Sequence, residues 1–241
     1  MIDFLIDIDT KVFLFLNDIN MPLFDHFMMA FTGKAIWVPM YATILFILYR
    51  RFGWRVATCY VIGITIAITI TDQVCASYIR PFVERLRPSN LANPISGEVH
   101  IVDGYRGGSY GFPSCHAANS FALATFLSLL FASRRFTIFI LTWAVLNSYS
   151  RLYLGVHYPG DLIVGGIVGA IVGWGTFLSL RQVAIKVSRP NKYIRKPASG
   201  LIPIGNYTYA YHLSDIMIIA GCTISFFILA YAFMAWAGLF D

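Results

Sequence analysis

The sequence predicts an all-α polytopic membrane protein, a six-transmembrane helix bundle preceded by an N-terminal interfacial helix. Two observations carry this fold class. Of the 241 residues, 58% are hydrophobic and only 12% are charged, which is about half the charged share of a typical soluble domain. Six apolar runs also approach the roughly 20 residues that a helix needs to cross a bilayer. The length suits a single domain over residues 1–241.

Residues 1–24 are expected to form a helix that lies on the membrane surface. Acidic residues such as Asp7 and Asp9 are interleaved with apolar residues such as Phe4 and Ile8, which recur near helical spacing. The stretch has neither the basic segment nor the cleavage site of a signal peptide. The first span that follows is therefore expected to direct insertion.

The six spans are assigned to the apolar runs that follow: residues 28–49, 55–79, 114–132, 136–153, 161–180 and 216–239. Pro39 is expected to kink the first span, because proline lacks a backbone donor. In the fifth span, Gly165, Gly169 and Gly173 recur every four residues. This spacing predicts a small-residue face for close helix packing.

Basic residues gather in the loops that an alternating six-span layout places on one face. They are Arg50, Arg51, Arg55, Arg134, Arg135, Arg181, Lys186, Arg189, Lys192, Arg195 and Lys196. The positive-inside rule makes that face cytoplasmic. These residues account for much of the net charge of +6 as topology signals and lipid contacts, so no nucleic-acid partner is expected. The loop 88–113 is then extracytoplasmic.

The same layout collects unusual ionisable and polar residues on the outer face. They are Arg80, Arg87, Ser114, His116, Arg151, His157 and Asp161. Arg80 and Arg87 are about two helical turns apart and are expected to share a helix face, with Pro88 ending the helix. Three converging guanidinium groups would bind a phosphate. Arg85 is instead expected to reach lipid headgroups by itself.

Ser114 directly precedes the third apolar run and is expected either to cap that helix or to donate to a ligand. The backbone amides of Cys115 and His116 would then face outward at a helix N-terminus, which favours an anion. His116 and His157 are candidates for proton transfer and nucleophilic attack. Asp161, four residues after His157, is expected to orient its ring.

Other chemistries fit these residues poorly. A cysteine phosphatase of the C-x5-R type would need arginine where Phe121 follows Cys115. Crowded arginines oppose a metal cation, so neither a metal nor another cofactor is expected. The sequence also has no phosphate-binding loop of a nucleotide-driven pump.

The motifs resemble those of the type 2 phosphatidic acid phosphatase (PAP2) superfamily over residues 55–180, the expected catalytic core. The family carries K-x6-R-P, P-S-G-H and S-R-x5-H-x3-D. The matching residues, in the same order and spacing, are Arg80-x6-Arg87-Pro88, Pro113-Ser114-Cys115-His116 and Ser150-Arg151-x5-His157-x3-Asp161. Two positions depart from the family pattern, since Arg80 replaces lysine and Cys115 replaces glycine.

The resemblance implies a bacterial membrane lipid phosphatase that works without a metal. Its phosphate-binding group would consist of Arg80, Arg87, Ser114, Cys115 and Arg151. His157 would attack phosphorus and form a phospho-histidine, while Asp161 orients the ring. His116 would protonate the leaving oxygen and then activate water.

A site at the outer edge of the bundle suits a phosphate on a lipid headgroup. The candidate substrates are undecaprenyl diphosphate, phosphatidylglycerol phosphate, phosphatidic acid and a lipid A phosphate. Tyr105 and Arg106, in the loop 88–113, are candidates for headgroup contacts. The protein is thus expected to be multi-pass in the bacterial cytoplasmic (inner) membrane, with a periplasmic site. Its partners would be the bilayer and the phosphorylated lipid, and no obligate protein partner is indicated.

Two alternatives stay open. A lipid phosphotransferase would pass the phosphate from the same histidine to an alcohol instead of water. A non-catalytic anionic-lipid transporter would bind phosphate without turnover. Binding alone needs only the arginines, so the histidine pair argues for an enzyme.

Overall fold

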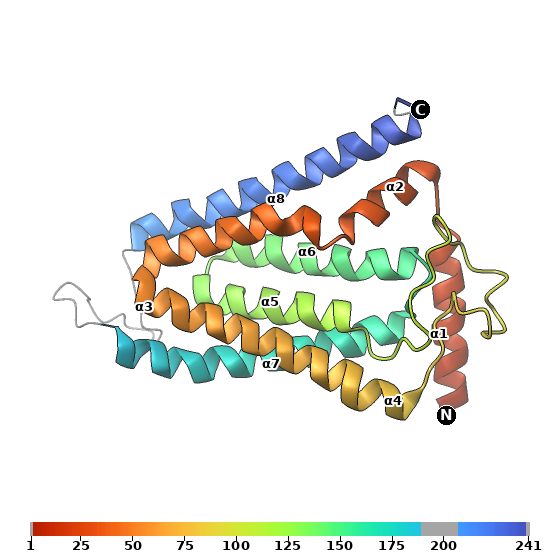
Figure 1. The fold of residues 1–241 in the computed structure, drawn as a ribbon, viewed down its shortest axis with the longest axis horizontal. Helices are drawn as coiled ribbons and strands as arrows, with labels where there is room; N and C mark the ends of the chain where they lie inside the picture. The colour runs from red at the N-terminus through yellow and green to blue at the C-terminus, as the bar shows by residue number, and fades with distance from the viewer. Residues whose placement is uncertain (1, 189–206, 240–241) are drawn as a thin grey trace.

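The computed structural model describes residues 2–188 and 207–239, and most of these residues are helical (Figure 1). The α-helices are α1 (Ile2–Asn17), α2 (Pro22–Phe31), α3 (Val38–Asp72), α4 (Arg80–Val83), α5 (Cys115–Phe131), α6 (Arg134–Tyr153), α7 (Pro159–Val187) and α8 (Tyr207–Trp236). A 3-10 turn, Ala35–Trp37, precedes α3, and a π-helical segment, Gln73–Ile79, follows it. The all-α prediction is confirmed for the described part of the chain.

Three helical stretches among the described residues are long and apolar enough to cross a membrane: Ala35–Val83, Pro159–Val187 and Ser214–Trp236. The first contains two of the predicted spans, because α3 reverses its direction near Gly53 (Figure 1). Gly53 has φ 73° and ψ 162°, which are not helical angles. The helices support a multi-pass membrane protein, and the count of six spans stays a prediction.

The first predicted span is interrupted. A turn and the 3-10 segment separate the end of α2 at Phe31 from the start of α3 at Val38. Pro39 therefore lies in the first turn of α3, where the absent N–H would have no partner in any case. The predicted kink at Pro39 is wrong for this reason.

The helix α1 lies across one end of the bundle, at a steep angle to the other helices (Figure 1). Phe13 of α1 is fully buried, and its ring packs edge-on against Tyr158 at a centroid distance of 5.3 Å. The Asn17 side-chain amide donates to the backbone carbonyl of Tyr153 at 2.9 Å. These two contacts hold α1 against the end of α6 and the connection to α7. Its position on the membrane surface stays a prediction, and α1 ends before residue 24.

The glycines of α7 pack directly against α5. A Cβ atom added at Gly165, Gly169 or Gly173 would collide with a backbone carbonyl oxygen of α5 or of its cap. The three oxygens belong to Ser114, Ala118 and Ala122. The predicted small-residue face is therefore the α5–α7 interface, where the two backbones touch over several turns.

The two ends of the bundle differ in composition. The reversal of α3, the α5–α6 connection and the end of α7 lie at one end, which contains the described members of the predicted cytoplasmic basic set (Figure 1). The start of α5, the start of α7 and α1 lie at the other end. Arg189, Lys192, Arg195 and Lys196 lie outside the described residues.

Candidate active site

His157 and Asp161 form a buried pair where α7 begins. His157 lies in the short connection before α7, and Asp161 lies in the first turn of that helix. The Nδ1 atom of His157 is 3.3 Å from the Oδ2 atom of Asp161, and the residues are 2% and 0% exposed. The same Oδ2 atom accepts the backbone N–H of Tyr158 at 3.0 Å, which fixes the carboxylate. Asp161 can therefore hold a proton on Nδ1 and leave Nε2 with its lone pair.

Arg87 lies against the other nitrogen of the His157 ring. Its Nη1 atom is 3.0 Å from Nε2 of His157 and 3.0 Å from the backbone oxygen of Val156. An arginine only donates, so Nε2 is the acceptor. Burial lowers the pKa of His157 to about 3, and the charges of Arg87 and Arg151 act in the same direction. The bond to Asp161 opposes this shift, but the ring is neutral near neutral pH.

Arg80 and Arg87 do not share a helix face, and that prediction is wrong. The helix α4 ends at Val83, and Glu84 adopts a left-handed conformation with φ 46°. The chain is then extended, and Leu86 pairs with Tyr110. Arg80 stays on the helix, where its Nη2 atom donates to the Pro113 carbonyl at 3.2 Å.

Arg85 does not reach toward headgroups as predicted. Its Nη1 atom lies 3.0 Å from Oδ1 of Asp161 and 2.8 Å from Oδ2 of Asp9. Its guanidinium carbon also lies 3.8 Å from the centre of the Tyr158 ring. Alternate residues of an extended segment face the same side. The alternation Arg85-Leu86-Arg87 is the sequence feature that could have predicted two arginines on one side of an extended segment. The predicted helix over these residues does not allow that arrangement.

Arg151 completes the group of buried arginines at the end of α6. It is 9% exposed, and its Nη2 and Nη1 atoms donate to the Tyr105 hydroxyl at 2.8 Å and to Thr32 Oγ1 at 3.1 Å. Burial, together with the positive charges of Arg151 and Arg80, lowers the pKa of Arg87 to about 10. Arg87 still carries its charge at neutral pH. Arg87 and Arg151 therefore create a positive, buried environment for the His157 ring, with Arg87 in contact with Nε2.

The two candidate headgroup residues have different surroundings. Tyr105 contacts Arg151 through its hydroxyl and lies beneath that guanidinium at 5.3 Å. Arg106 donates to the Ser89 carbonyl at 2.6 Å, and the Ser89 hydroxyl donates back to the Arg106 carbonyl at 2.8 Å. Tyr105 thus adjoins the arginine group, while Arg106 fastens the loop to the turn after Pro88.

Ser114 caps α5. Its hydroxyl accepts the Ala117 N–H at 3.4 Å, and its own N–H donates to the Asp161 carbonyl at 3.0 Å. The second bond joins the start of α5 to the start of α7. The backbone amides of Cys115 and His116 consequently lie at a helix N-terminus, a position that favours an anion.

His116 forms a hydrogen bond with Asn147, a residue that the sequence motifs did not indicate. The Nε2 atom of His116 lies 3.2 Å from Oδ1 of Asn147. The Asn147 amide donates to Ser120 Oγ at 2.9 Å, which directs its oxygen toward the histidine. His116 therefore carries its proton on Nε2, and Nδ1 is the atom left to exchange a proton with a substrate.

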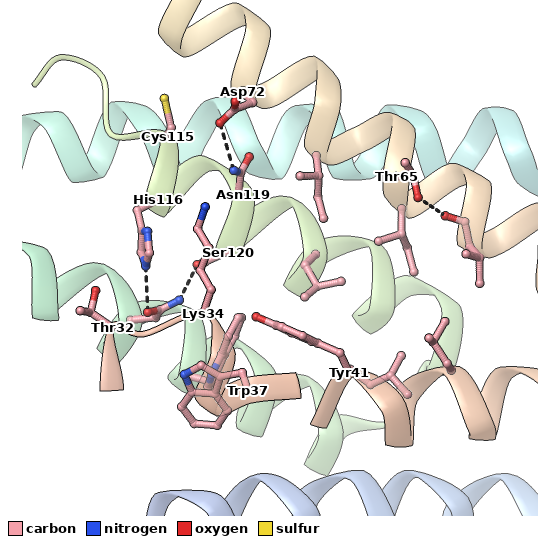
Figure 2. A pocket seen from close by; sticks show the side chains of 18 residues that line it. Thr32, Lys34, Trp37, Tyr41, Thr65, Asp72, Cys115, His116, Asn119 and Ser120 are labelled. Atoms are coloured by element: carbon pink, nitrogen blue, oxygen red, sulfur yellow. Dashed lines mark hydrogen bonds between the residues drawn. The ribbon is translucent and has the colours of Figure 1, made fainter. Parts of the chain in front are cut away.

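His116 also lines a cavity of about 430 Å³ between α3, α5 and α6 (Figure 2). Polar lining residues such as Asp72, Cys115 and Lys34 lie near His116, whereas Ile44, Val61 and Leu123 line it farther along the helices. The cavity therefore joins a polar region to an apolar one.

Comparisons with known proteins identify the family of the chain. The sequence pattern of the PAP2 superfamily matches residues 56–184. A lipid A 4'-phosphatase of Bacteroides thetaiotaomicron is 62% identical over 174 residues, which cover 72% of this chain and 77% of that protein. A lipid A 4'-phosphatase of Porphyromonas gingivalis is 37% identical over 171 residues, covering 71% and 72%.

A solved structure shares the fold. The crystal structure of Aquifex aeolicus LpxE matches with a TM-score of 0.54 and 24% identity, covering 70% of this chain and 94% of that chain. The PAP2 match over residues 56–184 includes Arg87, Arg151 and both histidines described above. The chain belongs to the PAP2 superfamily, as a lipid phosphatase of that type.

Proposed function

We propose that the chain removes the 4'-phosphate of lipid A through a phospho-histidine formed on His157. One observation carries the mechanism: the Nε2 atom of a buried, neutral His157 faces the guanidinium of Arg87 at 3.0 Å. A phosphoryl group that replaces this contact would meet a nucleophile on one side and a positive charge on the other. The identity of 62% with a lipid A 4'-phosphatase favours that lipid among the candidate substrates.

The first step forms a bond between His157 Nε2 and phosphorus and breaks the bond between phosphorus and the sugar oxygen. Asp161 accepts a hydrogen bond from the Nδ1–H group of the ring and stabilises the positive charge that develops there. His116 enters this step doubly protonated and delivers the Nδ1 proton to the leaving oxygen, while Nε2 keeps its own proton in the bond to Asn147. Water then attacks phosphorus, His116 takes a proton from it, and inorganic phosphate leaves His157.

Positive charge and backbone amides stabilise the transferring phosphoryl group. Arg80, Arg87 and Arg151 supply the charge, and the amide of Cys115, at the helix start that Ser114 caps, supplies a fixed donor. The equatorial oxygens of phosphorus carry the charge that these groups neutralise. The arginines take the place that metal ions hold in other phosphoryl-transfer sites, so we propose that no metal is needed.

The cavity beside His116 suits a substrate with hydrocarbon chains. Its apolar part accepts one acyl chain while the sugar phosphate reaches the arginine group. Tyr105, and Arg106 in the same loop, would contact the headgroup around the phosphate. The site lies at the end of the bundle opposite the described members of the predicted cytoplasmic basic set. We therefore propose an extracytoplasmic site in the bacterial inner membrane.

Phosphate release from purified lipids tests this function. The purified protein should release phosphate from lipid A in the presence of a metal chelator and without a partner protein. Lipid A labelled at the 4'-phosphate should label the protein in an acid-labile, alkali-stable form typical of phospho-histidine. His157→Gln should do neither. Activity that is lost with chelator would overturn the proposed mechanism, and release only from other lipids would overturn the substrate.

An added alcohol or acceptor lipid separates hydrolysis from phosphotransfer. Hydrolysis predicts inorganic phosphate as the main product whether or not the acceptor is present. A phosphorylated acceptor as the main product would instead assign the chain to the phosphotransferases. Binding without any turnover would favour the transporter alternative.

A further inference from the structure

Arg85 connects the N-terminal helix to the nucleophile pair. Its Nη1 atom lies between two carboxylates, 2.8 Å from Oδ2 of Asp9 and 3.0 Å from Oδ1 of Asp161. The side chains of Arg85 and Asp9 are only 19% and 16% exposed, and that of Asp161 is 1% exposed. One guanidinium therefore neutralises two acidic groups, of which one belongs to the site and one to α1.

Asp9 makes a second contact with the same region. Its Oδ1 atom accepts the backbone N–H of Gly160 at 2.8 Å. Gly160 lies in the first turn of α7, between His157 and Asp161 in the chain. A Cβ atom at position 160 would come within 2.8 Å of Asp9 Oδ2, so the glycine permits this approach. Asp9 thus touches both the backbone that precedes Asp161 and the cation that pairs with it.

Other contacts hold α1 in place without Asp9. Phe13 packs against Tyr158, and the Asn17 amide donates to the carbonyls of Leu152 and Tyr153 at 3.3 and 2.9 Å. Loss of the Asp9 charge would therefore leave the helix docked. A variant without the Asp9 charge can therefore test the effect of Asp9 on the site while α1 stays in place.

We propose that Asp9 is a positioning residue of the phosphatase site, which shares Arg85 with Asp161 and so keeps the Asp161 carboxylate directed at His157. Without Asp9, the full charge of Arg85 would act on Asp161 alone. That carboxylate would then stabilise the positive ring of phosphorylated His157 less well, and the Oδ2 contact would loosen. Lipid binding would not change, because neither Asp9 nor Arg85 belongs to the proposed phosphate-binding group. This inference rests on the proposed function of His157.

The test compares Asp9→Asn with Asp7→Asn in the full-length enzyme. We expect Asp9→Asn to lower kcat by roughly 10- to 100-fold with little change in KM, as misplaced catalytic groups do. Asp9→Glu should restore part of the rate. Asp7 lies one half-turn away and pairs only with Lys11 on the exposed side, so Asp7→Asn should match the wild type. Wild-type kinetics in Asp9→Asn would overturn the inference.

A combination with Arg85 distinguishes positioning from anchoring. In an Arg85→Gln background, Asp9→Asn should have no further effect on kcat, because both act through one contact. Independent, additive losses, or a rise in KM equal to the loss in kcat, would contradict the inference. The rates are measured with whichever of lipid A, phosphatidylglycerol phosphate or phosphatidic acid the wild type hydrolyses. A wild type that ignores lipid A therefore overturns the proposed substrate alone, whereas a wild type that never labels His157 overturns both.

Discussion

Asp161 holds His157 with one carboxylate oxygen and Arg85 with the other. Oδ2 lies 3.3 Å from His157 Nδ1, and Oδ1 lies 3.0 Å from Arg85 Nη1. The carboxylate is thereby fixed in its plane, so it can orient the imidazole without turning away. The strength with which the Asp161 carboxylate attracts His157 therefore depends on how strongly Arg85 interacts with the same carboxylate and with Asp9.

Replacing Asp161 with asparagine should reduce turnover much more than substrate binding. The amide has nearly the same shape, but it lacks the charge that stabilises a positive ring on His157. By comparison with other oriented histidines, kcat should fall by about 10²- to 10⁴-fold. Steady-state phosphate release gives kcat and KM, and gel filtration checks that the variant is folded. A folded variant with wild-type kcat would remove Asp161 from the mechanism.

The stability of the protein should fall in mild acid because of His157. Its pKa in the folded protein is about 3, below the value of about 6.5 in an unfolded chain. Between these values the unfolded chain binds a proton that the folded protein does not bind, so the free energy of unfolding decreases as the pH falls. The midpoint temperature of thermal unfolding, measured in detergent, should therefore decrease when the pH is lowered from roughly 7 to roughly 5.

His157→Gln is the control for this pH dependence. Glutamine cannot take up the proton, so the variant should lose less of its thermal midpoint over the same pH interval. An equal loss in both proteins would mean that other groups cause the acid sensitivity.

Cys115 should make the enzyme sensitive to thiol reagents. Its sulfur is 2.9 Å from Arg80 Nη2 and forms a hydrogen bond with the buried Cys75. A maleimide on Cys115 would fill the space near the phosphate-binding amides, so phosphate release should stop, and bound substrate should slow the loss. The Cys115→Gly variant should release phosphate at the same rate before and after treatment with maleimide. Cys222→Ser, which changes an exposed thiol elsewhere, should stay sensitive.

The α5–α7 contact should not tolerate even one methyl group. A Cβ at position 169 would collide with the Ala118 carbonyl, so Gly169→Ala should destabilise the fold by about 1 to 3 kcal/mol. At Gly175, on the same helix, a Cβ has no atom within 4 Å. Gly175→Ala should therefore be neutral or slightly stabilising, since alanine favours a helix. Thermal unfolding of the two variants side by side measures the difference.

The sequence predicted best those elements that local signals define. The run 114–132 begins at a serine cap and is mostly apolar, and α5 occupies Cys115–Phe131. The run 136–153 similarly corresponds to α6, Arg134–Tyr153. Motif spacing also indicated the residues that the fold gathers beside His157, because the starts of α5 and α7 meet at one end of the bundle.

Contacts between distant segments were not predictable in the same way. The path from Arg80 to Arg87 depends on the left-handed Glu84 and on the pairing of Leu86 with Tyr110, which local periodicity does not reveal. Asn147 has no motif and acts only because α6 passes His116. An acidic residue in an amphipathic segment gives no sign of a buried partner, so the sequence does not predict the contact of Asp9 with Arg85.

The close contact of α5 with α7 has a consequence for how a bulky lipid enters. Ser114 and His116 stand on one of these helices and Asp161 on the other, and their backbones touch along the glycine positions of α7. The proposed acid and nucleophile thus lie at the starts of two helices in close backbone contact, so we expect the distance between them to change little during turnover. We therefore expect the lipid to enter on the other flank of the cavity, which Thr32 and the start of α3 line. The substrate would then enter the cavity laterally without any separation of α5 from α7.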